Sequence, residues 1–306
     1  MVWRLHLSDQ SIPYLDILSG GNHPLLACWI RHNYVAYYDL ITGNQVGEKF
    51  ITATGMEDRR GDAWQLFLAN LIAPNGVYLP FVRLEGVTVF LSKDGKLRLY
   101  QSGTTDLYLE NLGEETSLVI HDDGFVAVGL DRFLGLVAAL DRSGDIHIFQ
   151  QNIKVGVFPT GLTPRSELRA SIAISDGGSA VYVCDGETII RTDSSGKIHK
   201  KITSHYPIRQ IVCSPNGLIL LTHDFENGVI RAYEGATFTP THQRFGIDLL
   251  LEAQPRQLLA DMPPRAVTIS ALDVDDSGNI AFSMSGVICV THRERMDSIP
   301  RLQSLF

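Results

Sequence analysis

Short apolar runs alternate with polar, glycine-containing turns along the whole chain. The pattern is clearest from Leu66 to Tyr100, where runs rich in Val, Leu, Phe and Tyr are separated by Pro74-Asn75-Gly76, Glu85-Gly86 and Asp94-Gly95. Asn-Gly and Asp-Gly supply the positive backbone dihedrals that tight hairpin turns need, so consecutive runs should pair antiparallel. The segment therefore predicts a meander of short strands.

Two glycine turns recur in six successive stretches of the sequence. The first turns fall at Gly21, Gly76, Gly124, Gly178, Gly217 and Gly278, and the second at Gly43, Gly95, Gly144, Gly196 and Gly235. The two turns of a stretch are 18 to 22 residues apart. In the sixth stretch the second turn is expected near Met296 and Asp297, where there is no glycine. A unit repeated about every 51 residues is typical of a propeller or a solenoid.

The length and composition of the unit favour a propeller. Helical repeats would show a 3.6-residue period, and a β-solenoid would need shorter, more uniform coils. We therefore predict an all-β fold: a single β-propeller domain over residues 1–306, built from four-stranded antiparallel meanders. Six blades are visible in the sequence, and seven remain the alternative. Irregular insertions are expected at about 53–63 and 240–265.

The two ends of the chain contain short strand-like segments, Val2 to Leu7 and Ile299 to Phe306. Propeller rings close when one terminus completes a blade that the other terminus begins, which removes an exposed sheet edge. One of the two segments is expected to close the ring. Truncation of either end should therefore destabilise the fold.

Two segments resemble the WD40 and YVTN-type propeller families. IVCSPNGLILLTHD, from Ile211 to Asp224, places a small-polar-Gly turn before a strand, and YYDLITGNQV, from Tyr37 to Val46, contains a D-x-x-T-G turn after one. The Trp-Asp and Gly-His dipeptides of WD40 repeats are missing from the sequence. The resemblance implies a ring of blades, and its turn motifs carry little information about function.

Composition excludes some classes of function. Hydrophobic residues make up 44% and charged residues 20% of the chain, which is enough for a packed core. The net charge is −8 and there is no block of basic residues, so nucleic acid binding is not expected. No apolar run is long enough to span a membrane, and the first ten residues lack the apolar centre of a secretory signal. A soluble, cytoplasmic protein is expected.

The four cysteines lie far apart, at positions 28, 184, 213 and 289. Buried free thiols in a reducing compartment are the favoured interpretation, and disulfides are the alternative. A structural zinc site is not expected, because there is no CxxC pair.

Residues that depart from the repeat are the candidates for binding. Adjacent Arg59 and Arg60 in the first insertion could grip a carboxylate or phosphate, or could pair with the flanking acids on a solvated surface. In the second insertion Asp248 could cap a helix. This apolar insertion could dock a partner protein, or could pack on the propeller itself. Its candidate contacts are Leu249, Leu250, Leu251, Leu258 and Leu259.

Local motifs of catalysis were not found. The run from His223 to Gly228 contains groups that could bind a metal or exchange protons, but a tight hairpin at Asn227-Gly228 also explains it. There is no HExxH, GxSxG, GxxxxGK[ST] or GxGxxG, so no catalytic, metal or cofactor residue is assigned.

The sequence favours a non-enzymatic module that binds other proteins, as a scaffold or as a subunit of a larger assembly. One alternative is a six-bladed hydrolase or lactonase with a central divalent metal, although Glu85, Asp185 and Asn279 read as ordinary strand-end residues. The other alternative is a propeller that senses a small molecule in its central channel. The side chains around the axis would separate these classes.

Overall fold

The computed structural model describes most of the repeat units. The described residues are 3–6, 14–18, 24–31, 34–50, 81–84, 87–91, 97–102, 106–111, 116–120, 125–131, 136–150, 153–164, 170–224, 228–255, 269–284 and 286–299. The first insertion, 53–63, lies outside them, as do residues 256–265 of the second.

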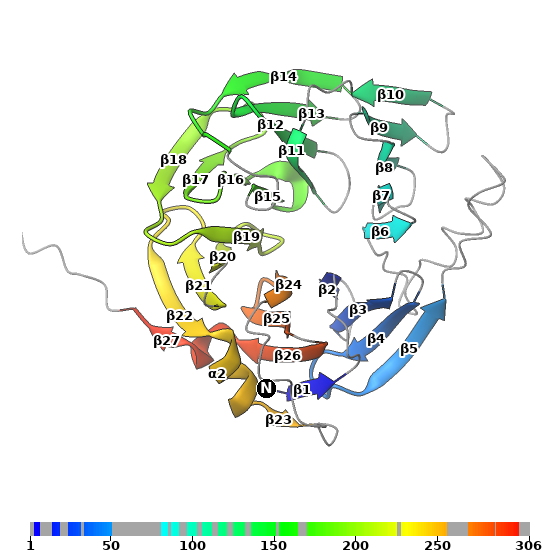
Figure 1. Cartoon of the computed structure of the whole chain (residues 1–306), viewed down its shortest axis with the longest axis vertical. Coiled ribbons are helices and arrows are strands. Elements are labelled where there is room, and N and C mark those ends of the chain that lie inside the picture. The colour runs from blue at the N-terminus through cyan, green and yellow to red at the C-terminus, as the bar shows by residue number, and fades with distance from the viewer. Residues whose placement is uncertain are drawn as a thin grey trace, which may run out of the picture.

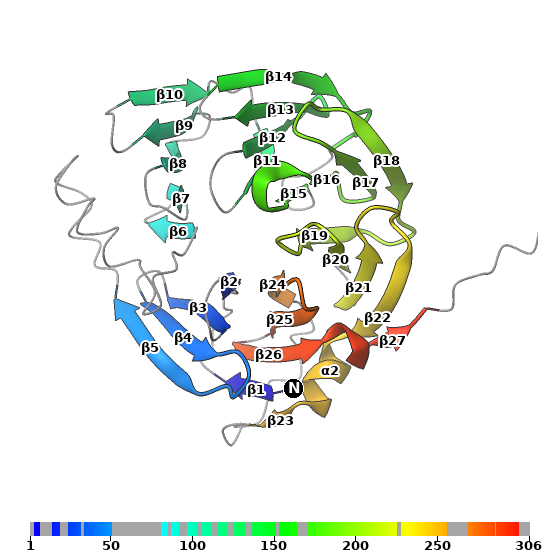
Figure 2. The same cartoon turned by 180° about the vertical axis from the view of Figure 1, so that it is seen from behind.

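In the described part of the chain, six sheets of mainly antiparallel strands stand side by side in a ring, as Figure 1 shows along the shortest axis of the molecule and Figure 2 shows from behind. The strands nearest the centre are β2, β6, β11, β15, β19 and β24. This arrangement confirms the predicted all-β propeller. Three of the sheets have the expected four strands, and the other three have five.

The first three sheets come from the N-terminal half of the chain. The first contains β2 (Tyr14–Leu18), β3 (Leu25–Arg31), β4 (Tyr34–Asp39) and β5 (Gln45–Phe50). The second contains β6 (Phe81–Leu84), β7 (Val87–Leu91), β8 (Leu97–Ser102), β9 (Asp106–Asn111) and β10 (Thr116–Ile120). The third contains β11 (Phe125–Leu130), β12 (Leu136–Asp141), β13 (Asp145–Gln150) and β14 (Ile153–Pro159).

The other three sheets combine the C-terminal half with the N-terminal strand. The fourth contains β15 (Ser171–Ile174), β16 (Val181–Cys184), β17 (Thr188–Thr192) and β18 (Ile198–Thr203). The fifth contains β19 (Ile208–Cys213), β20 (Ile219–Asp224), β21 (Val229–Glu234), β22 (Pro240–Phe245) and β27 (Asp297–Ser298). The sixth contains β24 (Ile269–Val274), β25 (Asn279–Met284), β26 (Val287–His292), β1 (Trp3–His6) and β23 (Gln254–Pro255).

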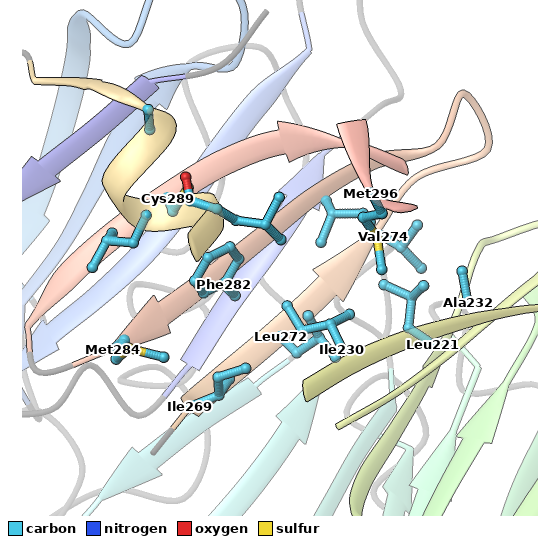
Figure 3. Packing of buried hydrophobic residues seen from close by; sticks show 14 of the residues in the cluster. Leu221, Ile230, Ala232, Ile269, Leu272, Val274, Phe282, Met284, Cys289 and Met296 are labelled. Carbon is cyan, nitrogen blue, oxygen red and sulfur yellow. The ribbon is translucent and has the colours of Figure 1, made fainter. Parts of the chain in front are cut away.

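The hydrophobic core is divided into layers between neighbouring sheets. Figure 3 shows the layer between the fifth and sixth sheets, in which Leu221 and Ile230 face Leu272 and Phe282. The second strands β16 and β20 are buried along their whole length because both of their faces are covered, whereas the outer strand β18 is largely exposed. Burial therefore falls from the second strand of a sheet to its outer edge.

The N-terminal strand closes the ring. β1 pairs antiparallel with β26 from Trp3↔Val290 to His6↔Val287, and so supplies the fourth strand of a sheet that the C-terminal repeat begins. This confirms that one terminus completes the last sheet. A turn does follow β26, at Arg293–Met296 and close to the expected position, but the strand after it, β27, joins the edge of the fifth sheet and not that of the sixth.

The predicted turns of the third unit are also partly wrong. Asp123-Gly124 precedes β11, so it lies between the second and third sheets. The connection between β11 and β12 instead begins at Asp131, whose Oδ1 accepts a hydrogen bond from the N–H of Leu136. A buried aspartate therefore organises this connection. As a result, Gly144 follows the second strand of its sheet, whereas Gly43 and Gly196 follow the third.

Outer turns and bulky aromatic side chains join neighbouring sheets. Gly43 has a φ of +71°, and a Cβ there would lie 2.8 Å from Cδ2 of Trp3 in the sixth sheet. A Cβ at Gly196 would clash with Phe158 of the third sheet in the same way. In the fifth sheet the corresponding turn has Phe238 at a φ of 57°, and its own ring packs on Tyr182 of the fourth sheet. Either the turn leaves room for an aromatic ring or it supplies the ring itself.

Candidate interaction surface

The structure places three of the seven predicted contact residues. Leu249, Leu250 and Leu251 lie in the short helix α2 (Gly246–Glu252), which follows β22. The other four predicted contacts lie outside the described residues: Arg59, Arg60, Leu258 and Leu259.

Helix α2 occupies the outer side of the ring between the fifth and sixth sheets, in both views of the molecule (Figures 1 and 2). It begins after Phe245, whose backbone is extended, and not at Asp248 as predicted. Asp248 lies in the first turn instead, where its charge favours the positive end of the helix. The N–H of Ala253 donates to the carbonyl of Leu249 at the other end.

Leu249 and Leu250 belong to the core of the protein. Both are completely buried, and Leu249 packs in the layer between the fifth and sixth sheets with Phe282 and Met284. Nη1 of Arg4 donates to the carbonyl of Leu250 at 2.8 Å, which ties the helix to the N-terminal strand. This part of the insertion therefore packs on the propeller itself. Its two buried leucines offer no surface to a partner.

Leu251 points away from this core and is 64% exposed. Phe245, just before the helix, is 47% exposed. On either side of them in sequence, Arg244 and Glu252 form an ion pair between Nη2 and Oε1, and Nη1 of Arg244 donates to the carbonyl of Arg295 at 2.8 Å. This pairing fixes α2 against β22 and leaves the two apolar side chains in solvent.

Exposed apolar side chains concentrate on the outer rim, by which we mean the outermost strand of each described sheet, the strand β22 on which β27 lies, and α2. Ten large apolar side chains are at least 40% exposed in the part of the chain that the structure describes. Seven of them are on the rim: Val46, Ile153, Val155, Val157, Ile198, Phe245 and Leu251. The rim is therefore the surface best suited to bind another protein.

Two histidines pair with aspartates in a repeated turn motif that the sequence analysis missed. Nε2 of His147 lies 2.8 Å from Oδ2 of Asp141, and Nε2 of His199 lies 2.7 Å from Oδ2 of Asp193. The signal was the shared spacing Asp-x-Ser-Gly-x-Ile-His at 141–147 and 193–199. The hydroxyl of Ser195 donates to Asp193, and this bond, with those from His199 and two backbone N–H groups, lowers the pKa of the carboxyl. The two His–Asp pairs therefore stabilise the turns at 141–147 and 193–199.

The His223 to Gly228 segment is a hairpin connection. β20 ends at Asp224 and β21 begins at Val229, whose N–H lies 3.4 Å from Oδ1 of Asp224. Oδ2 of the same carboxylate faces Nη1 of Arg231 at 3.5 Å. The guanidinium of Arg231 lies 4.3 Å from the centre of the Tyr206 ring. The side chain of Asp224 thus serves the local packing of the fifth sheet.

Burial lowers the pKa of His223 to about 4, so the stability of the fold should depend on pH. The unfolded chain, with a histidine pKa near 6.5, binds more protons than the folded chain between about pH 4 and 6.5. Stability should therefore fall as the pH drops through this window, by up to about 3 kcal/mol. Urea unfolding at pH 7 and pH 4.5 measures this loss. In His223→Gln the loss should shrink, and an unchanged pH dependence would contradict a neutral buried imidazole.

The strand-end residues considered for a central metal have structural roles. Asp185 accepts hydrogen bonds from the backbone N–H groups of Glu187 and Thr188, and the side-chain amide of Asn279 donates to Asp275. Glu85 lies outside the described residues. Within the described ranges, no group of three or more His, Cys, Asp or Glu side chains could hold a metal ion.

All four cysteines are free thiols, and three are buried. Burial raises the pKa of Cys184 to about 12, and it also raises the pKa of Cys28 and Cys289. The buried thiols therefore stay protonated and fill space in the core. Among the described segments, no helix is both long and apolar enough to cross a membrane.

The ring of antiparallel sheets defines the protein as a β-propeller. Its fold is similar to that of the crystal structure of Chaetomium thermophilum Raptor, with a TM-score of 0.61 and 10% sequence identity. The alignment covers 97% of this chain and 29% of the Raptor chain, so this chain spans less than a third of Raptor's length. At this identity the similarity shows the fold alone. No protein-family model and no curated protein sequence matches the chain.

Proposed function

We propose that this propeller is a non-enzymatic module of the WD40/YVTN-like kind, which binds other proteins through its rim in the cytoplasm. The observation that carries the proposal is the concentration of exposed apolar side chains on the outer strands and α2. Apolar side chains that stay in solvent on a well-packed fold mark surfaces that partners cover. The similarity in fold to Raptor supports the propeller architecture on which the proposal rests.

Partner capture with rim variants tests the proposal. The tagged full-length chain is compared with a Val155→Ser, Val157→Ser, Leu251→Ser variant in cells that express the protein naturally. A control with Ile41→Ser and Leu218→Ser changes equally exposed side chains off the rim. Because each buried interface side chain contributes about 1–2 kcal/mol, we expect the rim variant to recover at least about tenfold less partner than the control.

Point substitutions are preferable to deletion of residues 245–265, because the deletion would remove the buried Leu249 and Leu250 and unfold the sixth sheet. The melting temperatures of both variants should match that of the wild type. Failure of the wild-type chain to recover any stoichiometric partner would refute the proposal.

A further inference from the structure

The outer edge of the fifth sheet carries an added strand from a distant part of the chain. β27 pairs antiparallel with β22, with Ser298 opposite His242 and Asp297 opposite Gln243. The N–H of Ile299 also donates to the carbonyl of Thr241 at 2.8 Å. In the sixth sheet β23 adds to β1 in the same position, but parallel. The outer edges of these blades therefore accept short extended segments.

β18, the outer strand of the fourth sheet, has the same local geometry as β22. Ala232 pairs with His242 and Tyr233 pairs with Pro240, so Thr241 is an extra residue that forms a bulge in β22. The bulge lies just before the residues of β22 that pair with β27. In β18 a shift between Arg191 and Thr192 places His199 at the corresponding position.

Lys200 and Lys201 of β18 therefore correspond to His242 and Gln243, the two residues of β22 that receive β27. In the described part of the chain, no strand pairs with the outer edge of β18. This edge has the geometry of an occupied one, and the described segments of the chain supply no occupant for it.

The charge on this edge is positive although the protein has a net charge of −8. Lys197, Lys200 and Lys201 are exposed, and β18 contains no acidic residue. None of the three ammonium groups has a carboxylate within 4.0 Å among the described residues, and Nζ of Lys201 donates to the carbonyl of Gly161. The nearest acid in sequence, Asp193, already pairs with His199.

Lysines on an edge strand oppose pairing with a second copy of the same edge, because like charges would face each other. They favour an extended segment whose side chains are acidic, since main-chain hydrogen bonds supply affinity and charge selects the partner. We infer that the outer edge of β18 binds an extended acidic segment of another protein as an added antiparallel strand. The inference rests on the function proposed above and names one contact of that module.

Short labelled peptides test the inference on the full-length chain by fluorescence anisotropy at low salt. A peptide of alternating valine and glutamate should bind at least about tenfold tighter than one of alternating valine and lysine. The double variant Lys200→Glu, Lys201→Glu should bind the acidic peptide at least about tenfold more weakly than the wild type. Lys154→Glu, on the outer strand β14 of the third sheet, should not weaken this binding. N-methylation of the amides on one edge of the peptide should abolish binding, and N-methylation of the other edge should preserve it.

Two results would overturn the inference. One is equal binding of the acidic and basic peptides. The other is that the acidic peptide still binds whichever of its two edges is N-methylated. Because both lysines are exposed, the Lys200→Glu, Lys201→Glu protein should have the same melting temperature as the wild type. The Lys200→Gln, Lys201→Gln protein should show an intermediate loss of affinity for the acidic peptide. Partner capture tests the β18 edge and the general interaction function separately. If the wild type and the charge-reversed variant recover equal amounts of partner, this edge is refuted while the interaction function stands; if the wild type recovers none, both fail.

Discussion

Replacement of Trp3 by alanine is expected to lower the free energy of unfolding by about 3–5 kcal/mol. The side chain is completely buried, and its Nε1 donates to the carbonyl of Leu40 at 2.9 Å. Its ring fills the space above Gly43, where even a Cβ would clash. The substitution therefore leaves a cavity and an unpaired carbonyl at the joint between the first and sixth sheets.

Urea unfolding followed by circular dichroism measures this loss. Tyr206→Ala is the matched control because it removes an aromatic side chain that is half exposed, and it should cost less than about 1 kcal/mol. Since β1 is the fourth strand of the sixth sheet, removal of residues 1–6 should destabilise the fold at least as much as Trp3→Ala. A Trp3→Ala protein as stable as Tyr206→Ala would show that the N-terminal strand does not close the ring.

Two adjacent leucines of α2 are expected to behave in opposite ways. Leu250→Ala should cost about 2–5 kcal/mol, because the side chain is completely buried where the helix packs between the fifth and sixth sheets. Leu251→Ala should change stability by no more than about 0.5 kcal/mol, because the side chain lies mostly in solvent.

The same unfolding measurement compares the two variants, each serving as the control for the other. Equal losses in stability would contradict the orientation of α2. If Leu250→Ala left the stability unchanged, the helix would not be part of the core, and the whole insertion would again be a candidate docking element.

The propeller could be predicted because its turns are encoded locally. Aspartate side chains that accept backbone N–H bonds and glycines with positive φ mark a hairpin within a few residues, as at Asp39–Gly43 and Asp193–Gly196. Such turns repeat at blade spacing, so the architecture follows from a count of them. Closure by a terminal strand follows from the same reasoning, because an open last sheet would expose its edge.

The assignment of particular strands to sheets could not be predicted in this way. The connection between β11 and β12 begins at Asp131 and not at the expected Asp123-Gly124, and Phe238 takes the place of glycine at positive φ because its ring packs on Tyr182. In the sixth sheet the chain departs after β26 because the N-terminal strand already occupies the next position. These choices depend on residues that are distant in sequence.

The candidate surface was only partly visible in the sequence. The sequence predicts an apolar insertion after β22, but it does not show which leucines of a short helix face the core; in the structure Leu250 is buried and Leu251 is exposed. The lysines of β18 form no charge run long enough to stand out. Their importance comes from an open sheet edge, which only the strand order reveals.

Chemical cross-linking with mass spectrometry in cells that express the protein naturally tests the central claim most directly. Lys154, Lys197, Lys200 and Lys201 place reactive amines on the rim of the third and fourth sheets. We expect reproducible cross-links from these lysines to one partner protein, and a loss of the cross-links from Lys154 and Lys197, whose amines remain, when Lys200 and Lys201 are replaced by glutamate. Reproducible partner cross-links that avoid the rim, or none to any protein, would contradict a module that binds partners through its outer edge.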